Sequence, residues 1–500
     1  MTKKEKQIYP RSRKEMLRIM KTAEKEGNLL ETALEEFTMH SFSMPALWDC
    51  RDYIFRIERE NYEKAPFLIS LLALLSAMAG RLDEAKEYVD ILGKNPGHWQ
   101  LQDFNVNDFC RVSTELVMPY TEDFMFLRIV FFLVKVGAVP VRSLTLSACR
   151  PSIINGFRDF TRFGSCLERY RNIITETVEK LYGSGGKGVY EIVLAEWYYQ
   201  NNNCFQALVL VTGTIPLMEQ EKDMRCLFVA LALQMKILLV NGQTRTAKPL
   251  VEKIRDRIHQ TGWEELTSSL NAFECLAACY DGRLDEVEEW LEKAAPDENK
   301  DIYMMDMYAY LIKVRCYLQT GKYMVAHVLV KQLIILLTPG KRHMDLCECY
   351  MLSAMIFHKA NDKKHLCEEL EKSLEIAGKY NYIRLLADEG NCMVQMLSIY
   401  QQEKGADDFT SQIMELATEV GMHFPDYLKS PAEYFEPLTV TEKTVLRLMA
   451  QGMSNDEIAN RMGKKTGTVK FHSNNIFRKL QVQNRQQAVN RGREINLLLK

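Results

Sequence analysis

The sequence of 500 residues lacks any apolar run long enough to cross a bilayer. Its most apolar stretch, FMFLRIVFFLVKVG at 124–137, contains Arg128 and Lys135 and falls short of the roughly 20 residues that a membrane helix needs. The opening MTKKEKQIYPRSRKEM is basic, but the apolar core of a signal peptide does not follow it. The sequence therefore predicts a cytoplasmic protein without membrane contact.

The 13 cysteines form neither a dense disulfide framework nor a pattern typical of metal sites. Their odd number and wide scatter fit reduced thiols in the cytosol. The segments 343–349 and 358–367 contain His and Cys without zinc-site spacing, and Cys275 and Cys279 lie one helical turn apart, as in ordinary core packing. We expect no metal and no cofactor.

Sequence signals of an enzyme are also missing. No Ser/His/Asp or Cys/His constellation stands out, and the phosphate-loop pattern GxxxxGK[ST] does not occur. The similar string GSGGKG at 183–188 lacks the first glycine at the required spacing and the Ser or Thr after lysine. We expect it to be a flexible loop, and we expect no enzymatic activity.

Helical periodicity dominates from about residue 62 to 424, and Gly or Asn recurs within it at a fixed interval. These residues tolerate the left-handed backbone at the corner of a helical hairpin. The strings GRLDEA and GRLDEV begin at two such positions, 80 and 282. Successive corners about 40 residues apart are expected at Asn202, Gly242, Gly282, Gly321 and Asn361. A sustained beat of this length predicts an α-solenoid of TPR-like hairpins.

Three prolines in GMHFPDYLKSPAEYFEP, at 421–437, end this rhythm. We therefore expect an all-α chain with a helical cap of uncertain role at 1–60 and an α-solenoid for sensing or interaction at 61–425. A linker at 426–437 and a four-helix module at 438–500 follow. The module has 12 Lys and Arg against 4 Asp and Glu, a net charge of +8, whereas the rest of the chain has −10. This asymmetry indicates that the module meets a polyanion.

Within the module, Ser454 can cap a short helix that Gly463 ends, and a longer helix follows from about Thr466. A short helix, a tight turn and a second helix with a polar outer face are typical of a helix-turn-helix that enters the DNA major groove. Lys464 and Lys465 precede this second helix, whose first amides, beginning at Thr466, can hold phosphate.

On the second helix, Lys470 and Asn474 share one face with Phe471 beside them. Arg478 and Lys479, together with Arg485 further on, can reach a flanking phosphate strand. The alternative is a solvated amphipathic helix in an interaction domain.

Residues 438 to about 498 resemble the LuxR-type DNA-binding domain, through LTVTE, VLRLMAQGMSNDEIA, TVKFH, IFRKL and VQNRQQAV. The resemblance implies that Lys470, Phe471 and Asn474 face bases. It also implies phosphate contacts for Thr468, Lys479 and Arg485. The operator sequence does not follow from these residues.

The solenoid is similar in architecture to the sensor region of MalT-like regulators. Those relatives carry an N-terminal ATPase, whereas the missing phosphate loop argues against an ATP-driven switch in this sequence.

The sequence thus predicts a transcriptional regulator that binds double-stranded operator DNA, as a dimer through its last helix. A small molecule or a protein is the expected signal, and a groove lined by Trp197, Tyr198 and Tyr199 is the expected site for it. RNA polymerase stays open as a further partner. The alternative function is a protein-interaction scaffold in which DNA binding is secondary.

Overall fold

The computed structural model describes most of the chain. The described residues are 11–39, 44–58, 65–93, 110–111, 114–115, 118–119, 150–182, 186–220, 224–429, 438–480 and 482–494. In these ranges the structure is α-helical, and the only extended pairing is an isolated bridge between Asn155 and Asp159. No helix in the described ranges is long and apolar enough to cross a membrane. The GSGGKG string lies partly outside the described residues.

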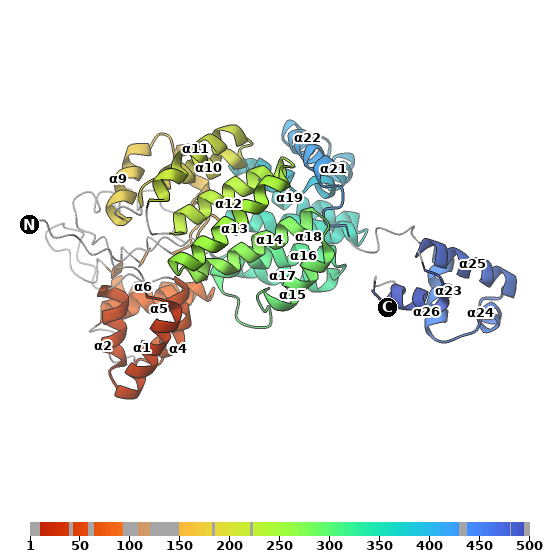
Figure 1. Ribbon diagram of the computed structural model, residues 1–500, viewed down its shortest axis with the longest axis horizontal. Coiled ribbons are helices and arrows are strands. Elements are labelled where there is room, and N and C mark those ends of the chain that lie inside the picture. The colour runs from red at the N-terminus through yellow and green to blue at the C-terminus, as the bar shows by residue number, and fades with distance from the viewer. Residues whose placement is uncertain are drawn as a thin grey trace, which may run out of the picture.

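The helices fall into an N-terminal group, a long central array and a C-terminal module (Figure 1). The N-terminal group comprises α1 (Arg13–Glu26), α2 (Leu29–Leu34), α3 (Met44–Asp49), α4 (Arg51–Ile54), α5 (Pro66–Met78) and α6 (Leu82–Gly93). The array comprises α9 (Arg171–Tyr182), α10 (Val189–Gln200), α11 (Cys204–Met218), α12 (Met224–Val240), α13 (Thr244–Thr261), α14 (Thr267–Tyr280), α15 (Leu284–Lys293), α16 (Met307–Gln319), α17 (Tyr323–Leu337), α18 (His343–Lys359), α19 (Lys363–Tyr380), α20 (Ile383–Ala387), α21 (Gly390–Lys404) and α22 (Asp408–His423). The module comprises α23 (Val440–Ala450), α24 (Asn455–Met462), α25 (Thr466–Lys479) and α26 (Arg485–Glu494).

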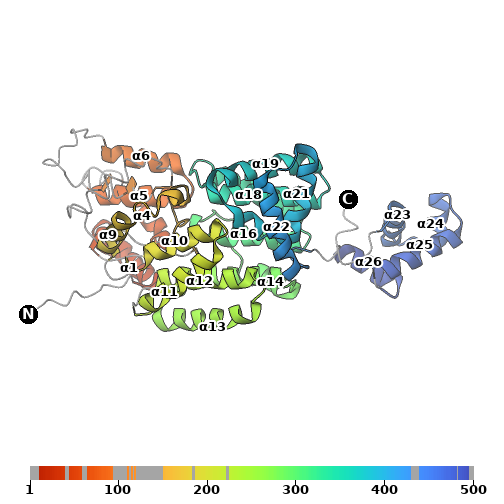
Figure 2. The same cartoon turned by 90° about the horizontal axis from the view of Figure 1, so that it is seen from above.

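Consecutive helices of the array pack as antiparallel hairpins, α10 with α11 through α18 with α19, and the hairpins stack side by side (Figures 1 and 2). The first helix of each hairpin is the more deeply buried: α12 and α16 are buried on nearly all sides, whereas α13 and α17 expose one face. This arrangement is the predicted α-solenoid.

The corners of the hairpins confirm the repeat of about 40 residues. The backbone φ is positive at each expected corner, with values of 62° at Asn202, 74° at Gly242, 68° at Gly282, 75° at Gly321 and 58° at Asn361. Each corner amide also bonds back to a carbonyl of the helix that it ends. Gly and Asn therefore occupy the corners because they adopt a positive φ at a lower energetic cost than other residues do.

The corner at Gly80 has a second reason to be glycine. Its φ is 75°, and a Cβ added there would lie 1.9 Å from Cδ1 of Leu336, on α17. The α5–α6 hairpin therefore docks closely against a helix more than 240 residues further along the chain. One continuous hydrophobic core runs from Met16 to Leu428, so the described part of the 1–60 region shares the core of the array.

The segment 150–161, which the sequence shows only as an interruption of the rhythm, crosses the interior of the array. Arg150 Nη2 donates to Asp345 Oδ1 at 2.8 Å, and Asn155 Nδ2 donates to the same oxygen at 2.9 Å. The carboxylate of Asp159 accepts from the amide of Met344, at the start of α18, at 3.1 Å. The polar side chains of this irregular segment are thus paired inside the core, and its backbone carbonyl at Phe157 accepts from Arg342 Nη1, just before α18, at 2.6 Å.

The module has a small core of its own, built around Leu446, Ile458, Val469, Ile476 and Ala488. Thr439 caps the N-terminus of α23 and Ser454 that of α24, and each forms a capping box with the glutamate three positions on. α24 and α25 begin at the positions expected from Ser454 and Thr466, and the described part of α26 ends at Glu494.

Candidate functional site

The turn between α24 and α25 has the geometry of a helix-turn-helix. Gly463 ends α24 in the left-handed region, with φ of 61°, and the amide of Lys464 bonds back to the carbonyl of Ala459 at 2.9 Å. α25 then begins at Thr466 without a side-chain cap on its first amides. Uncapped amides at a helix N-terminus are suited to bind a phosphate.

α25 divides into a buried and an exposed face. Val469, Ser473 and Ile476 are buried against the module's core, and the hydroxyl of Ser473 is satisfied by the carbonyl of Val469 at 2.8 Å. The side chains of Lys470 and Asn474 are exposed, as are those of Lys464, Lys465, Thr468 and Arg478. The structure therefore leaves most of the predicted DNA-contacting side chains exposed, on α25 and on the turn before it. Figures 1 and 2 show α24 and α25 within the C-terminal module, apart from the array.

Phe471 is 62% exposed on this same surface. A large aromatic side chain at such exposure gains little from the fold, and it lies beside Lys470 and Asn474 on the side predicted to face bases. Apolar contact with a thymine methyl group is one of the recognised ways to read the major groove.

Lys479, predicted to contact phosphate, is held within the module. Its Nζ lies 2.9 Å from Oε2 of Glu442 on α23, and the two side chains are 13% and 4% exposed. The same carboxylate accepts from the amide of Thr439 at 2.8 Å. Burial opposes ionisation of Glu442, but the hydrogen bonds from Lys479 and Thr439, together with the charge of Lys479, outweigh it and lower the pKa of Glu442. Lys479 thereby ties the C-terminal end of α25 to the start of α23.

Two further predicted phosphate contacts also make internal bonds. The guanidinium of Arg485 donates to the carbonyl of Met449 at 3.0 Å and to that of Met453, which closes the turn after α23. The hydroxyl of Thr466 donates to Asp456 Oδ1 at 2.7 Å. Both side chains are half-buried, so part of each is used to fix helices of the module.

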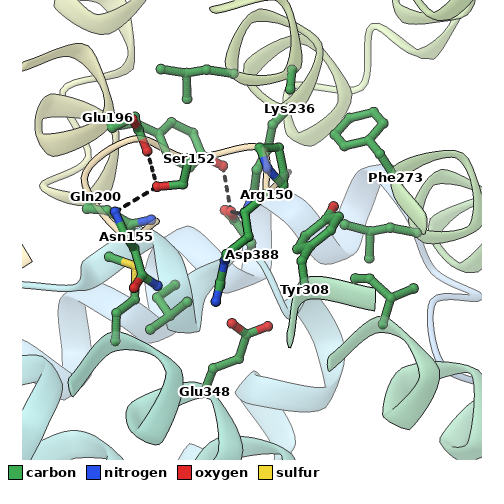
Figure 3. Close-up of a pocket in the computed structure, with 18 of the residues that line it drawn as sticks. Arg150, Ser152, Asn155, Glu196, Gln200, Lys236, Phe273, Tyr308, Glu348 and Asp388 are labelled. Carbon is green, nitrogen blue, oxygen red and sulfur yellow. Dashed lines mark hydrogen bonds and ion pairs between the residues drawn. The ribbon is translucent and has the colours of Figure 1, made fainter. Parts of the chain in front are cut away.

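A second candidate site is a cavity of about 120 Å³ inside the array (Figure 3). One wall is the internal segment, through Arg150, Ser152 and Asn155, and the others come from α10, α12, α14, α16, α18, α20 and the residues just after α20. Figure 3 shows Glu196 and Ser152 on one side of the cavity and Phe273 and Tyr308 on the other. Because its lining comes from many helices, a bound molecule would touch a large part of the array.

The charges around the cavity are paired. Arg315 Nη1 donates to Glu348 Oε1 at 2.7 Å, and Lys236 Nζ lies 3.4 Å from Asp388 Oδ2. Arg150 is paired with Asp345 as described above. The lining contains three basic side chains and four acidic ones, and one of the acids, Glu196, has a pKa raised to about 7. With Glu196 protonated the charges balance, and the lining then favours a polar molecule without net charge. The buried Oε1 of Gln200 has no hydrogen-bond partner among the described residues and lines this cavity.

Glu196 is an acidic side chain of the cavity whose pKa is raised. Burial raises its pKa to about 7, against the opposing hydrogen bonds from Ser152 and from the amides of Ile153 and Ile154. The amide of Ile153 donates to Glu196 Oε1 at 2.8 Å. Its protonation therefore changes near neutral pH, where the internal segment meets α10.

Of the three aromatic residues predicted to line an effector groove, Tyr199 lines this cavity. It is 1% exposed, and its hydroxyl donates to Asp388 Oδ2 at 2.5 Å. Trp197 packs near Gly164, and the hydroxyl of Tyr198 donates to Glu168 on the outer side. Three consecutive helical residues point in different directions, so they do not form one groove together.

Sequence reasoning missed the internal segment as a wall of the cavity. It also missed that Cys316 joins Cys275 and Cys279 in one cluster of thiols. A signal for the cluster was present, because Cys275 and Cys316 are 41 residues apart, which is one period of the repeat. No such signal exists for Arg150 and Asp345, which are 195 residues apart.

Two family models match the chain. One, described as the MalT-like TPR region, covers residues 161–403, and the other, described as bacterial regulatory proteins of the luxR family, covers 436–491. The two matches contain the cavity-lining helices of the array and the helix-turn-helix, respectively.

Similar curated proteins carry the name HTH-type transcriptional regulator MalT. Those of Yersinia pestis and Yersinia pseudotuberculosis are 27% identical over 168 residues, which is 30% of this chain and 19% of theirs. That of Serratia proteamaculans is 24% identical over 225 residues, 41% of this chain and 25% of its own length. The chain thus matches about a fifth to a quarter of the length of these relatives.

Proposed function

Because the chain joins a MalT-like TPR region to a regulatory domain of the bacterial luxR family, we propose that it is a DNA-binding transcriptional regulator. α25 enters the major groove, Lys470, Phe471 and Asn474 face base edges, and Lys464, Lys465, Thr468 and Arg478 contact phosphates. Thr466, Lys479 and Arg485 support this surface by fixing the helices that carry it. The backbone amide of Thr466 and the remaining N–H groups of Arg485 also contact phosphate.

The observation that carries the proposal is the outer face of α25. Its cationic and amide side chains are exposed, with an exposed Phe471 beside them, while the opposite face is buried in the module's core. The exposed ring of Phe471 beside exposed cations gives α25 both an apolar and a cationic contact, and a helix in the major groove uses both kinds.

The experiment is selection of a binding sequence from random DNA by the full chain, followed by titration of variants. Lys470→Ala and Asn474→Ala are expected to cost about 1–3 kcal/mol at the selected site and much less on random duplex. Lys465→Ala is expected to weaken both duplexes alike, because phosphate contacts carry no sequence information.

Equal losses on selected and random DNA for Lys470→Ala and Asn474→Ala would contradict this division of roles. Failure to select any sequence would contradict sequence-specific binding as a whole. Lys443→Ala, which changes a cation of α23 outside α25, is the matched control and is expected to leave the preference unchanged.

We also propose that the cavity in the array binds the signal, a small polar molecule without net charge. Its lining joins the internal segment to several hairpins, so occupancy favours one arrangement of the array over others. Binding of that molecule changes how tightly the chain holds DNA, and the chain acts on DNA as a dimer through α26.

A fluorescence-based thermal screen of small polar metabolites tests the cavity. A molecule that raises the melting temperature is expected to lose this effect in Gln200→Leu, which removes the unpartnered amide, and to keep it in Gln332→Leu, an exposed residue of α17. A molecule that stabilises both variants equally binds elsewhere.

A further inference from the structure

Three buried thiols meet between α14 and α16, outside both sites described above. The Sγ atoms of Cys275 and Cys316 are 3.3 Å apart, and those of Cys279 and Cys316 are 4.0 Å apart. All three sulfurs lie within 4.8 Å of one another. Cys275 is 4% exposed and the other two are fully buried.

The sulfurs are held in this arrangement by the helices. Cys275 and Cys279 are one turn apart on α14, so both face α16, where Cys316 lies between them. The cluster therefore offers three soft donors to a single ion, without rearrangement of the backbone.

The ligand count and the burial select the kind of ion. No His, Asp or Glu atom among the described residues completes the group as a fourth ligand, which disfavours the tetrahedral sites of zinc. Charge discriminates further, because three thiolates leave a net negative charge around monovalent copper or a divalent ion. A trivalent ion leaves none, and an unpaired charge in a fully buried place is costly.

We propose that Cys275, Cys279 and Cys316 form a binding site for a trivalent thiophilic metalloid, the chemistry of arsenite. In the binding step As(OH)3 exchanges its three hydroxyls for three sulfurs. Three As–O bonds break, three As–S bonds form, and each thiol proton leaves with a hydroxyl as water. No electron is transferred, so no oxidant is needed.

The consequence for the array is a bond between two helices that also line the cavity. Tyr280 of α14 and Arg315 of α16 lie beside Cys279 and Cys316 in sequence and face the cavity. A bound metalloid fixes α14 against α16 at that wall and stabilises the folded array.

Mass spectrometry of the reduced full chain treated with arsenite tests the proposal. The expected product gains one arsenic and loses three hydrogens, whereas capture by only two thiols keeps a hydroxyl and is heavier by one water. Cys316→Ala and Cys279→Ser are each expected to lose the three-sulfur product. Cys349→Ala, which removes a fully buried thiol of α18, is expected to keep it.

Thermal unfolding gives a second readout that does not depend on mass. Arsenite is expected to raise the melting temperature of the unaltered chain and of Cys349→Ala, and not that of Cys316→Ala. The proposal is overturned if the product keeps a hydroxyl, if Cys316→Ala binds as the unaltered chain does, or if zinc or cuprous ion binds these thiols and arsenite does not.

Discussion

The array and the module use charged side chains in opposite ways. In the array, Arg315 is 5% exposed and bonded to Glu348 and Glu389, and Arg342 is 1% exposed and bonded to Asp345. In the module, Lys464, Lys465 and Lys470 are exposed, and no ion pair involves them among the described residues.

The difference teaches what each region recognises. A buried charge that already has its partner fixes the shape of the protein and adds no net field outside it. Exposed cations with a shared face create a field that attracts a polyanion and sets the rate of encounter. The charges of the array therefore stabilise its own fold, whereas the exposed cations of α25 are suited to bind an anionic partner outside the chain.

The largest expected effect comes from breaking a buried pair of the array. Arg315→Met leaves Glu389 buried without its cation, which should lower the free energy of unfolding by about 3–5 kcal/mol in urea titration of the full chain. Lys293→Met is the control, since its pair with Glu289 lies on the surface and should change stability very little. Equal effects of the two changes would remove the contrast between buried and surface pairs.

The next effect concerns Glu196 and depends on pH. Because its pKa is raised from 4.5 to about 7 in the folded chain, the folded state holds the proton more tightly than the unfolded state does. Stability should therefore fall as pH rises from 4.5 to 7, by about 3 kcal/mol at most, and then level off.

Glu196→Gln should remove this part of the pH dependence, which is measured as the difference in melting temperature between variant and unaltered chain from pH 4.5 to 8. The difference isolates Glu196 from other groups with raised pKa values, such as Asp306. A difference that stays constant across this range would contradict a protonated Glu196 in the cavity.

The smallest expected effect concerns two lysines of the module, one paired inside the protein and one exposed. Lys479→Met should lower stability by about 1–3 kcal/mol, because Glu442 loses its partner, and should leave the salt dependence of DNA binding nearly unchanged. Lys464→Ala should do the reverse and reduce the slope of log affinity against log salt by about 0.9. If Lys479→Met reduces the slope as much as Lys464→Ala, its amine leaves Glu442 for a phosphate on DNA.

Local signals in the sequence predicted the regular parts of the fold. Gly282 and Asn361 were recognisable as corners because their conformation is a property of one residue and its neighbours, and Ser454 and Gly463 marked the ends of α24 for the same reason. The exposed face of α25 followed from helical periodicity once its ends were known.

The cavity could not be predicted in this way. Its walls depend on pairs such as Arg150 with Asp345, which are distant in sequence and have no repeat relation, and on the direction in which Tyr199 points. The prediction that Trp197, Tyr198 and Tyr199 act together assumed a shared face that consecutive helical residues do not have. The boundaries of the domains and the roles of the predicted DNA contacts stay predictions.

Residues 150–161 change how a stack of hairpins should come apart. In a linear array each repeat touches only its neighbours, so such proteins can unravel from one end, a few repeats at a time. Here the internal segment bonds to α10 through Glu196 and to α18 through Asp345. It thereby connects two helices that are more than 140 residues apart in the sequence. These buried hydrogen bonds and ion pairs should resist tension applied to either end of the array. The repeats between α10 and α18 should therefore unfold together as a single unit.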